Sequence, residues 1–196
     1  MNLTEKAAYQ QQTPYELWQK EEGLPILCGH CVEDLRTVST ASWKRKGVSG
    51  AFINLVGAGR TCDAYLCEIP AKGQSQPQRH MFEELIYILK GRGATTVWNE
   101  GGTKQSFEGQ EGSLFSPPLN TWHSHFNGRG DKPARYVSVT NRPLIMNLFH
   151  NLDFIFKNDF RFLDRYKGEE DYFSGRGKSI PGRVWESNFV PDVYSF

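Results

Sequence analysis

The chain has 196 residues, of which 38% are hydrophobic, 23% charged and 13% aromatic. These are the proportions of an ordinary globular protein, and the length suits one core with terminal extensions. Lys and Arg (23) nearly balance Asp and Glu (22) for a net charge of +1, and no basic run stands out, so neither nucleic acid nor a membrane surface is an expected partner.

Nothing in the sequence predicts secretion or membrane insertion. The first 20 residues are polar and lack the apolar stretch of a secretory signal, and no run of 18 apolar residues occurs. Four cysteines (Cys28, Cys31, Cys62 and Cys67) do not make a disulfide scaffold at this length. We therefore expect a reduced, cytoplasmic protein.

The first predicted element is a short helix near the N-terminus. Thr13 can cap it, Pro14 suits the first helical position, and Glu16 completes a capping box. Gly23 and Pro25 end it after about two turns.

From about residue 50 the pattern changes to short apolar runs separated by Gly, Pro and Asn. The predicted strands are Ala51–Val56, Asp63–Ile69, Leu85–Lys90, Ala94–Trp98, Ser113–Phe115, Trp122–Phe126 and Arg135–Thr140. Their close spacing, with turn residues and no helical pattern between them, predicts an antiparallel sandwich or barrel and not a βαβ fold. The expected class is all-β, of the jelly-roll type.

After about Pro143 the chain becomes rich in aromatic residues interleaved with polar ones, which is typical of short helices and loops on the barrel exterior. An aromatic platform for single-stranded nucleic acid is the alternative, but it lacks a basic groove. We expect three parts: an N-terminal arm with the short helix (1–49), the barrel (50–141) and a C-terminal extension packed on the barrel (142–196).

Two segments carry residues suited to metal binding. In a strand, residues two apart share a face, so Gln78, His80 and Glu84 can point inward together. A buried histidine and carboxylate are costly unless paired, and a divalent metal would pair them. In the second segment, His123 and His125 also share a face. His125 is interpreted as a catalytic acid/base residue beside the metal, or alternatively as a hydrogen-bonded core histidine.

These two segments resemble the two motifs of the cupin superfamily, G-x5-H-x-H-x3-E-x6-G and G-x5-P-x-G-x2-H-x3-N. His80, Glu84 and Gly91 match the first motif in spacing, and Gly112, Pro118, His123 and Asn127 match the second. The resemblance covers residues 50–141 and implies a conserved cupin jelly-roll barrel of the cupin-2 type. The overall pattern, including the tail from Gly182 to Asp192, resembles the N-terminal half of two-cupin proteins.

Two positions depart from the family pattern. Gln78 stands where the family has its first histidine, and Asn120 where it has a glycine, a mild change because Asn tolerates a left-handed backbone. The implied metal ligands are therefore His80, Glu84 and His123, with Gln78 as a weaker fourth. Two histidines and one carboxylate form the ligand set of non-haem Fe(II) oxygenases. Fe(II) is the expected cofactor, with Mn(II), Ni(II) or Zn(II) as alternatives.

The expected function is a mononuclear Fe(II)-type oxygenase acting on a small organic substrate. The alternatives are a non-catalytic small-molecule-binding or sensing cupin, which could have lost its metal, and a metal-dependent isomerase, lyase or decarboxylase. We expect a homodimer, because packing sheet against sheet would hide the barrel edges.

The cysteines offer two further hypotheses. Cys28-Gly29-His30-Cys31 resembles a redox dithiol motif, but no strand-helix context surrounds it. A four-cysteine zinc site with Cys62 and Cys67 is less regular in spacing than known sites.

Overall fold

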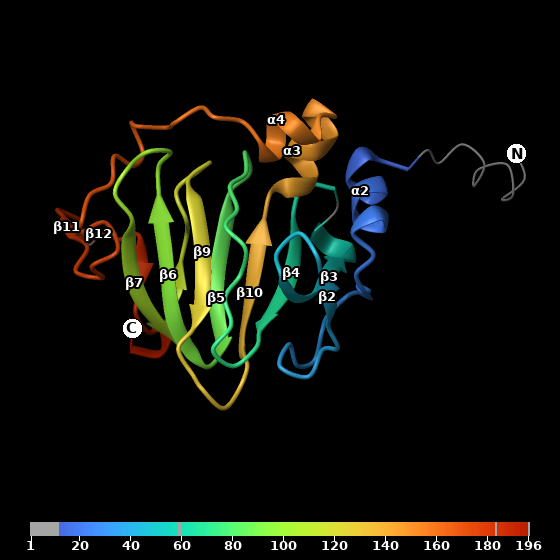
Figure 1. Cartoon of the computed structure of the whole chain (residues 1–196), viewed down its shortest axis with the longest axis horizontal. Helices are drawn as coiled ribbons and strands as arrows, with labels where there is room; N and C mark the ends of the chain where they lie inside the picture. Colours follow the sequence, from blue (N-terminus) through green and yellow to red (C-terminus); the bar gives the residue numbers. More distant parts are fainter. Residues whose placement is uncertain (1–11, 59, 183, 196) are drawn as a thin grey trace, which may run out of the picture.

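The structure is a computed structural model that describes residues 12–58, 60–182 and 184–195. Its centre is a sandwich of two β-sheets (Figure 1). The larger sheet has eight strands, seven of them in the order β1-β3-β4-β10-β5-β8-β13, with β2 paired beside β3. The smaller sheet has the order β7-β6-β9, and β11 pairs with β12 as a separate hairpin. The prediction of an all-β jelly roll is confirmed.

The strands of the larger sheet are β1 (Ile26–Gly29), β2 (Ala41–Trp43), β3 (Val48–Leu55), β4 (Asp63–Ile69), β5 (Glu84–Lys90), β8 (Leu114–Phe115), β10 (Ala134–Thr140) and β13 (Phe189–Val190). Those of the smaller sheet are β6 (Arg92–Trp98), β7 (Gln105–Gln110) and β9 (Trp122–Asn127), and the hairpin comprises β11 (Lys178–Ile180) and β12 (Val184–Glu186). Each of the seven predicted strands is present within a few residues of its predicted bounds. The pairs are antiparallel except that β1 runs parallel to β3.

Helix α2 (Pro14–Glu22) forms where the sequence predicts it. The Thr13 hydroxyl accepts a hydrogen bond from the Glu16 amide, and the Glu16 carboxylate accepts one from the Thr13 amide at 2.7 Å. Gly23 ends the helix in the left-handed conformation that glycine adopts without strain. The helix buries Tyr15 and Trp18 against the barrel core. The first eleven residues of the predicted N-terminal arm lie outside the described residues.

Two further helices, α3 (Arg142–Phe149) and α4 (Leu152–Phe156), follow β10 at one end of the barrel (Figure 1). A buried ion pair connects them to the sheet: Arg142, at the start of α3, donates two hydrogen bonds to Oδ2 of Asp63, at the start of β4. The Tyr15 hydroxyl of α2 donates to the same oxygen at 2.5 Å. This ion pair therefore joins both helical regions to the barrel.

The segment after α4 runs across the same end of the barrel before reaching the β11–β12 hairpin (Figure 1). The Met81 amide donates to the carbonyl of Ile155 at 2.9 Å. The Asn120 side-chain amide donates to the carbonyls of Asn158 and Phe160 at 3.1 and 2.8 Å. These bonds hold α4 and the residues just after it over the loops that lead into β5 and β9. We call this stretch, residues 152–160, the strap.

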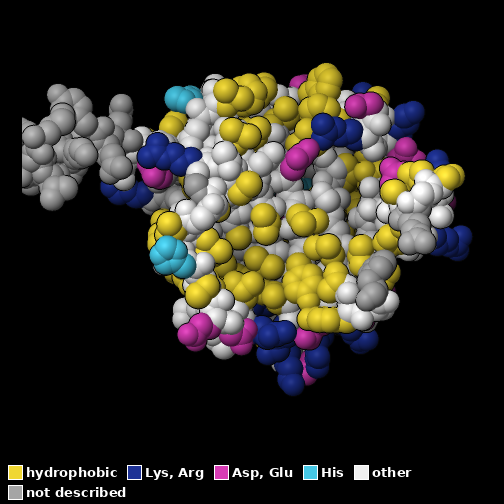
Figure 2. All heavy atoms as spheres, turned by 180° about the vertical axis from the view of Figure 1, so that it is seen from behind, with side chains coloured by type: hydrophobic (Ala, Val, Ile, Leu, Met, Phe, Trp, Pro, Cys, Tyr) yellow, Lys and Arg dark blue, Asp and Glu magenta, His cyan; other side chains and the backbone are white. Residues whose placement is uncertain are grey.

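Hydrophobic side chains remain exposed on the outer surface. Leu85 and Val139 lie opposite one another on β5 and β10, with 45% and 47% of their surface accessible. Figure 2 shows hydrophobic side chains gathered across the middle of one face of the molecule. In the described part of the chain, no helix is both long enough and apolar enough to cross a membrane.

Candidate metal centre

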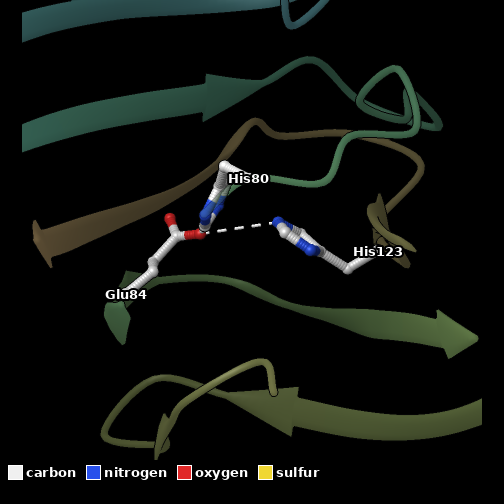
Figure 3. Close-up of side chains that lie close together, drawn as sticks. All are labelled: His80, Glu84 and His123. Carbon is white, nitrogen blue, oxygen red and sulfur yellow. Dashed lines mark hydrogen bonds and ion pairs between the residues drawn. The ribbon is translucent and has the colours of Figure 1, made fainter. Parts of the chain in front are cut away.

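His80, Glu84 and His123 meet inside the barrel (Figure 3). Glu84 begins β5, His80 lies in the loop before it, and His123 lies in β9 of the opposite sheet. The Glu84 Oε2 atom is 3.0 Å from Nε2 of His80 and 3.4 Å from Nε2 of His123. The ligand atoms of the three residues lie within 4.8 Å of one another, and all three side chains are buried. Among the described residues, this is the one group of His, Cys, Asp and Glu with such spacing.

The two histidine rings are oriented for metal binding. The Nδ1 atom of His80 lies 2.8 Å from the carbonyl oxygen of Phe82, and that of His123 lies 3.0 Å from the carbonyl oxygen of Thr121. A carbonyl only accepts hydrogen bonds, so each Nδ1 carries a proton, and in the neutral ring the Nε2 atom then keeps a lone pair. The buried Nε2 of His123 has no hydrogen-bond partner. A divalent metal among these three side chains would satisfy it, so the residues present fit a metal ion.

Glu84 receives further support on its other oxygen. Oε1 accepts hydrogen bonds from the hydroxyls of Tyr65 and of Ser138, the latter at 2.6 Å. Burial raises the pKa of Glu84, but the charge of Lys46 and the neighbouring His123 and His80 side chains outweigh it and hold the pKa well below its usual range. The carboxylate is therefore ionised, with Oε2 left for a ligand role.

Gln78 lies beside the site because it pairs with His123, and not because it shares a strand with Glu84 as predicted. The backbones of Gln78 and His123 form an antiparallel bridge, with N–H···O distances of 3.0 and 2.9 Å. Residues paired in this way project to the same side, so Gln78 neighbours His123. The buried Nε2 of Gln78 has no hydrogen-bond partner. The expectation that Gln78, His80 and Glu84 share one face of a single strand is wrong, because the chain loops between Gln78 and Glu84.

His125 also lies inside the barrel, with its ring centroid 5.6 Å from that of His123. Its Nδ1 atom pairs with the hydroxyl of Thr95 at 2.9 Å, whereas its buried Nε2 has no hydrogen-bond partner. Burial, aided by His123, lowers the pKa of His125 to about 3. A cavity of about 30 Å³ adjoins it, with apolar walls that include Ile86 and Phe115. His125 is thus a neutral hydrogen-bonding group beside a small apolar space.

The low pKa of His125 predicts a pH-dependent stability for the metal-free protein. Below about pH 6.5 the unfolded chain binds a proton at this histidine that the folded chain does not bind until about pH 3. The free energy of unfolding should therefore fall by about 1.4 kcal/mol per pH unit for this group as the pH drops through that window. Urea denaturation at pH 7, 6 and 5 should show a flatter dependence for His125→Gln than for the natural chain. Equal slopes would contradict this reading of His125.

Three buried residues of this network were not predicted from the sequence: Lys46, Tyr65 and Ser138. Tyr65 and Ser138 occupy inward positions of predicted strands, and that alternation was the available signal. Lys46 belongs to the turn between β2 and β3, where a lysine is ordinarily solvated, so no sequence pattern marks it.

The cysteines do not assemble into a site. Cys67 is buried in the core, whereas Cys28, Cys31 and Cys62 are exposed, and all four are free. The end of β1 and the bends after it hold the Cys28–Cys31 motif, without the helix that lowers a redox thiol's pKa.

The fold and the site together define a jelly-roll protein with a buried two-histidine, one-carboxylate centre. Residues 65–140 match the family model described as the cupin domain. The chain thus contains a cupin domain, as its two motifs predicted. Both motif glycines, Gly91 and Gly112, have positive φ angles (94° and 90°), which explains the residue type at these positions.

Solved structures give a weaker likeness. The oxalate decarboxylase of Lactobacillus farciminis in its formate complex is 21% identical, with a TM-score of 0.46, over 56% of this chain and 32% of that one. The vicilins of Capsicum annuum (13% identity, TM-score 0.46, 52% and 30% coverage) and of tomato, Solanum lycopersicum (13%, 0.44, 48% and 28%), are similar in the same way. The chain spans about a third of the length of these proteins. No curated protein matches the sequence.

Proposed function

We propose that this protein is a mononuclear metal-dependent cupin enzyme of the Fe(II) oxygenase type, acting on a small organic substrate. The observation that carries the proposal is the convergence of two histidine Nε2 atoms and one carboxylate oxygen in a buried space. This ligand set is typical of non-haem Fe(II) oxygenases. Fe(II) held there would supply the one-electron chemistry that reaction with dioxygen needs.

The side chains around the ligands would organise a substrate. Phe82 stacks on the ring of His80, with ring centroids 3.8 Å apart and planes within 1° of parallel, and so excludes water from that side. His125 would hydrogen-bond a substrate atom through Nε2. Its low pKa makes it a weak base, so we assign it the orientation of substrate or the brief acceptance of a proton.

The direct test is metal content followed by turnover. Protein purified without added metal would be measured by elemental analysis, reloaded anaerobically with Fe(II), Mn(II), Ni(II) or Zn(II), and assayed for oxygen uptake with candidate small substrates. The proposal expects one bound metal per chain and uptake dependent on Fe(II). If the protein binds none of the four metals, the enzyme proposal is wrong, and the non-catalytic binding or sensing role is the remaining explanation.

Gln78 is proposed as a weak fourth ligand. An amide oxygen binds a divalent metal less strongly than an imidazole does, so Gln78→His should raise the affinity about tenfold or more. Isothermal titration with Mn(II) would measure this. Gln76→His is a suitable control, because Gln76 is exposed. An unchanged affinity in the Gln78 variant would place the fourth coordination position elsewhere.

Two alternatives keep the same site. The substitution of a histidine ligand by Gln78 favours a small-molecule-binding or sensing role with little or no metal. A metal-dependent isomerase, lyase or decarboxylase would bind metal without consuming oxygen, so the oxygen-uptake assay separates it from an oxygenase.

The assembly proposed for the chain is a homodimer formed through the face that carries Leu85 and Val139. Exposed apolar side chains on the outer surface of a sheet favour such packing. We retain the division into an arm (1–49), a barrel (50–141) and a C-terminal extension (142–196), and a reducing, cytoplasmic location, as parts of the same proposal.

A further inference from the structure

Lys46 is a buried lysine, with 3% of its surface accessible. Its Nζ atom donates a hydrogen bond to the hydroxyl of Tyr65 at 2.6 Å and lies over the rings of Tyr65 and Trp43 at 4.3 and 5.1 Å. A buried ammonium is costly to maintain unless an opposite charge lies near it. Its hydrogen-bond partner, a phenol, does not itself supply that charge.

The negative charge that balances Lys46 is the carboxylate of Glu84, which is connected to Lys46 through Tyr65. The Tyr65 hydroxyl accepts from Lys46 and donates to Oε1 of Glu84, so one phenol links the ammonium to the carboxylate. The nearby Asp63 and Arg142 neutralise one another. The other groups at Glu84, namely His80, His123 and Ser138, are uncharged when the histidines are neutral.

We propose that Lys46 is the internal counter-charge of Glu84, connected to it through Tyr65, and that it keeps the metal site formed when no metal is bound. This inference rests on the proposed function only in treating Glu84 as a metal ligand. Lys46 is thus a positioning residue that acts through Tyr65 and Glu84.

The proposal makes Lys46 act in opposite directions on the two states of the protein. Without metal, Lys46 balances a carboxylate that would otherwise be buried and unpaired, so it stabilises the fold. With metal, two positive charges share the carboxylate, so Lys46 opposes metal binding by Coulomb repulsion. A lysine that merely filled space would weaken both properties when replaced.

The first test is a double-mutant cycle on the metal-free protein with Lys46→Met, Glu84→Gln and both changes together. Urea denaturation should show that Lys46→Met shifts the unfolding equilibrium at least about 100-fold, but less than about tenfold when Glu84 is already Gln. Lys44→Met, in the same turn but exposed, is the matched control and should cause little change. If Lys46→Met alone does not fold, folding of the double variant supports the proposal, and its failure contradicts it.

The second test is the affinity for Mn(II), followed by the electron paramagnetic resonance signal of the free ion. Lys46→Met should bind Mn(II) about tenfold more tightly than the natural chain, and Lys44→Met should not differ from it. Additive effects in the cycle, or an affinity that is unchanged or lower in Lys46→Met, would overturn the proposal. Strong coupling in a protein that binds no Mn(II), Fe(II), Ni(II) or Zn(II) would support the counter-charge and refute the proposed function.

Discussion

Replacing His123 with glutamine should lower the affinity for Fe(II) at least about 100-fold and remove any oxygen uptake that depends on it. Groups that only support a ligand already contribute 10–100-fold, so the loss of a ligand should cost no less. The Nε2 atom of His123 faces Oε2 of Glu84 from the opposite sheet, so its removal leaves only His80 and Glu84 with the weaker Gln78 as ligands. Anaerobic titration of the metal-free protein with Fe(II) would measure the effect.

The chain provides a close control for this experiment. His30 is exposed and lies outside the barrel site, so His30→Gln should bind Fe(II) as the natural chain does. Both proteins should also show native circular dichroism, which would assign the loss to the ligand and not to unfolding. Undiminished binding by the His123 variant would mean that His80, Glu84 and His123 are not the ligand set.

Replacing Asp63 with alanine should lower the free energy of unfolding by about 3–5 kcal/mol, because it leaves the Arg142 guanidinium buried without its partner. The side chains of Arg142 and Asp63 are only 2% and 1% accessible, so water cannot compensate. The change also removes the acceptor of the Tyr15 and Thr140 hydroxyls. Urea denaturation monitored by tryptophan fluorescence would report the loss, since Trp18 lies beside Arg142.

An exposed ion pair is the control for this variant. Asp153 contacts Lys157 at 2.7 Å, and both side chains are about three-quarters exposed. Water and salt screen such a pair, so Asp153→Ala should leave stability nearly unchanged. Equal losses for the Asp63 and Asp153 variants would show that burial does not set the strength of the Asp63–Arg142 pair.

The sequence predicts most of the barrel because its strands carry apolar runs bounded by turn residues. The sequence does not predict β7. In Gln105–Gln110 the only large apolar residue is Phe107. A strand with one solvated face and few apolar side chains has the sequence pattern of a loop. The short strands β1 and β13 owe their pairing to partners far along the chain, which local patterns do not record.

The candidate site, too, is predicted from the sequence only in part. The motif spacing identifies His80, Glu84 and His123, which the fold brings together. It does not reveal that Lys46 enters the barrel from a turn, because burial of a lysine depends on tertiary contacts. The role of Asn120 is also tertiary. It has a positive φ angle of 58°, which a glycine would also allow, but only its side-chain amide can bind the strap.

We expect the strap to control how quickly a metal ion enters and leaves the centre. The three ligand side chains are at least 94% buried, and Asn120 and Met81 hold the strap over the loops that lead into β5 and β9. We expect entry and exit under the strap to require these hydrogen bonds to open, so that their opening sets the rate while the ligands set the equilibrium. A bound metal would leave slowly even when its affinity is modest. A chelator would remove it at a rate independent of chelator concentration, and loosening the strap would change the lifetime of the complex more than its strength.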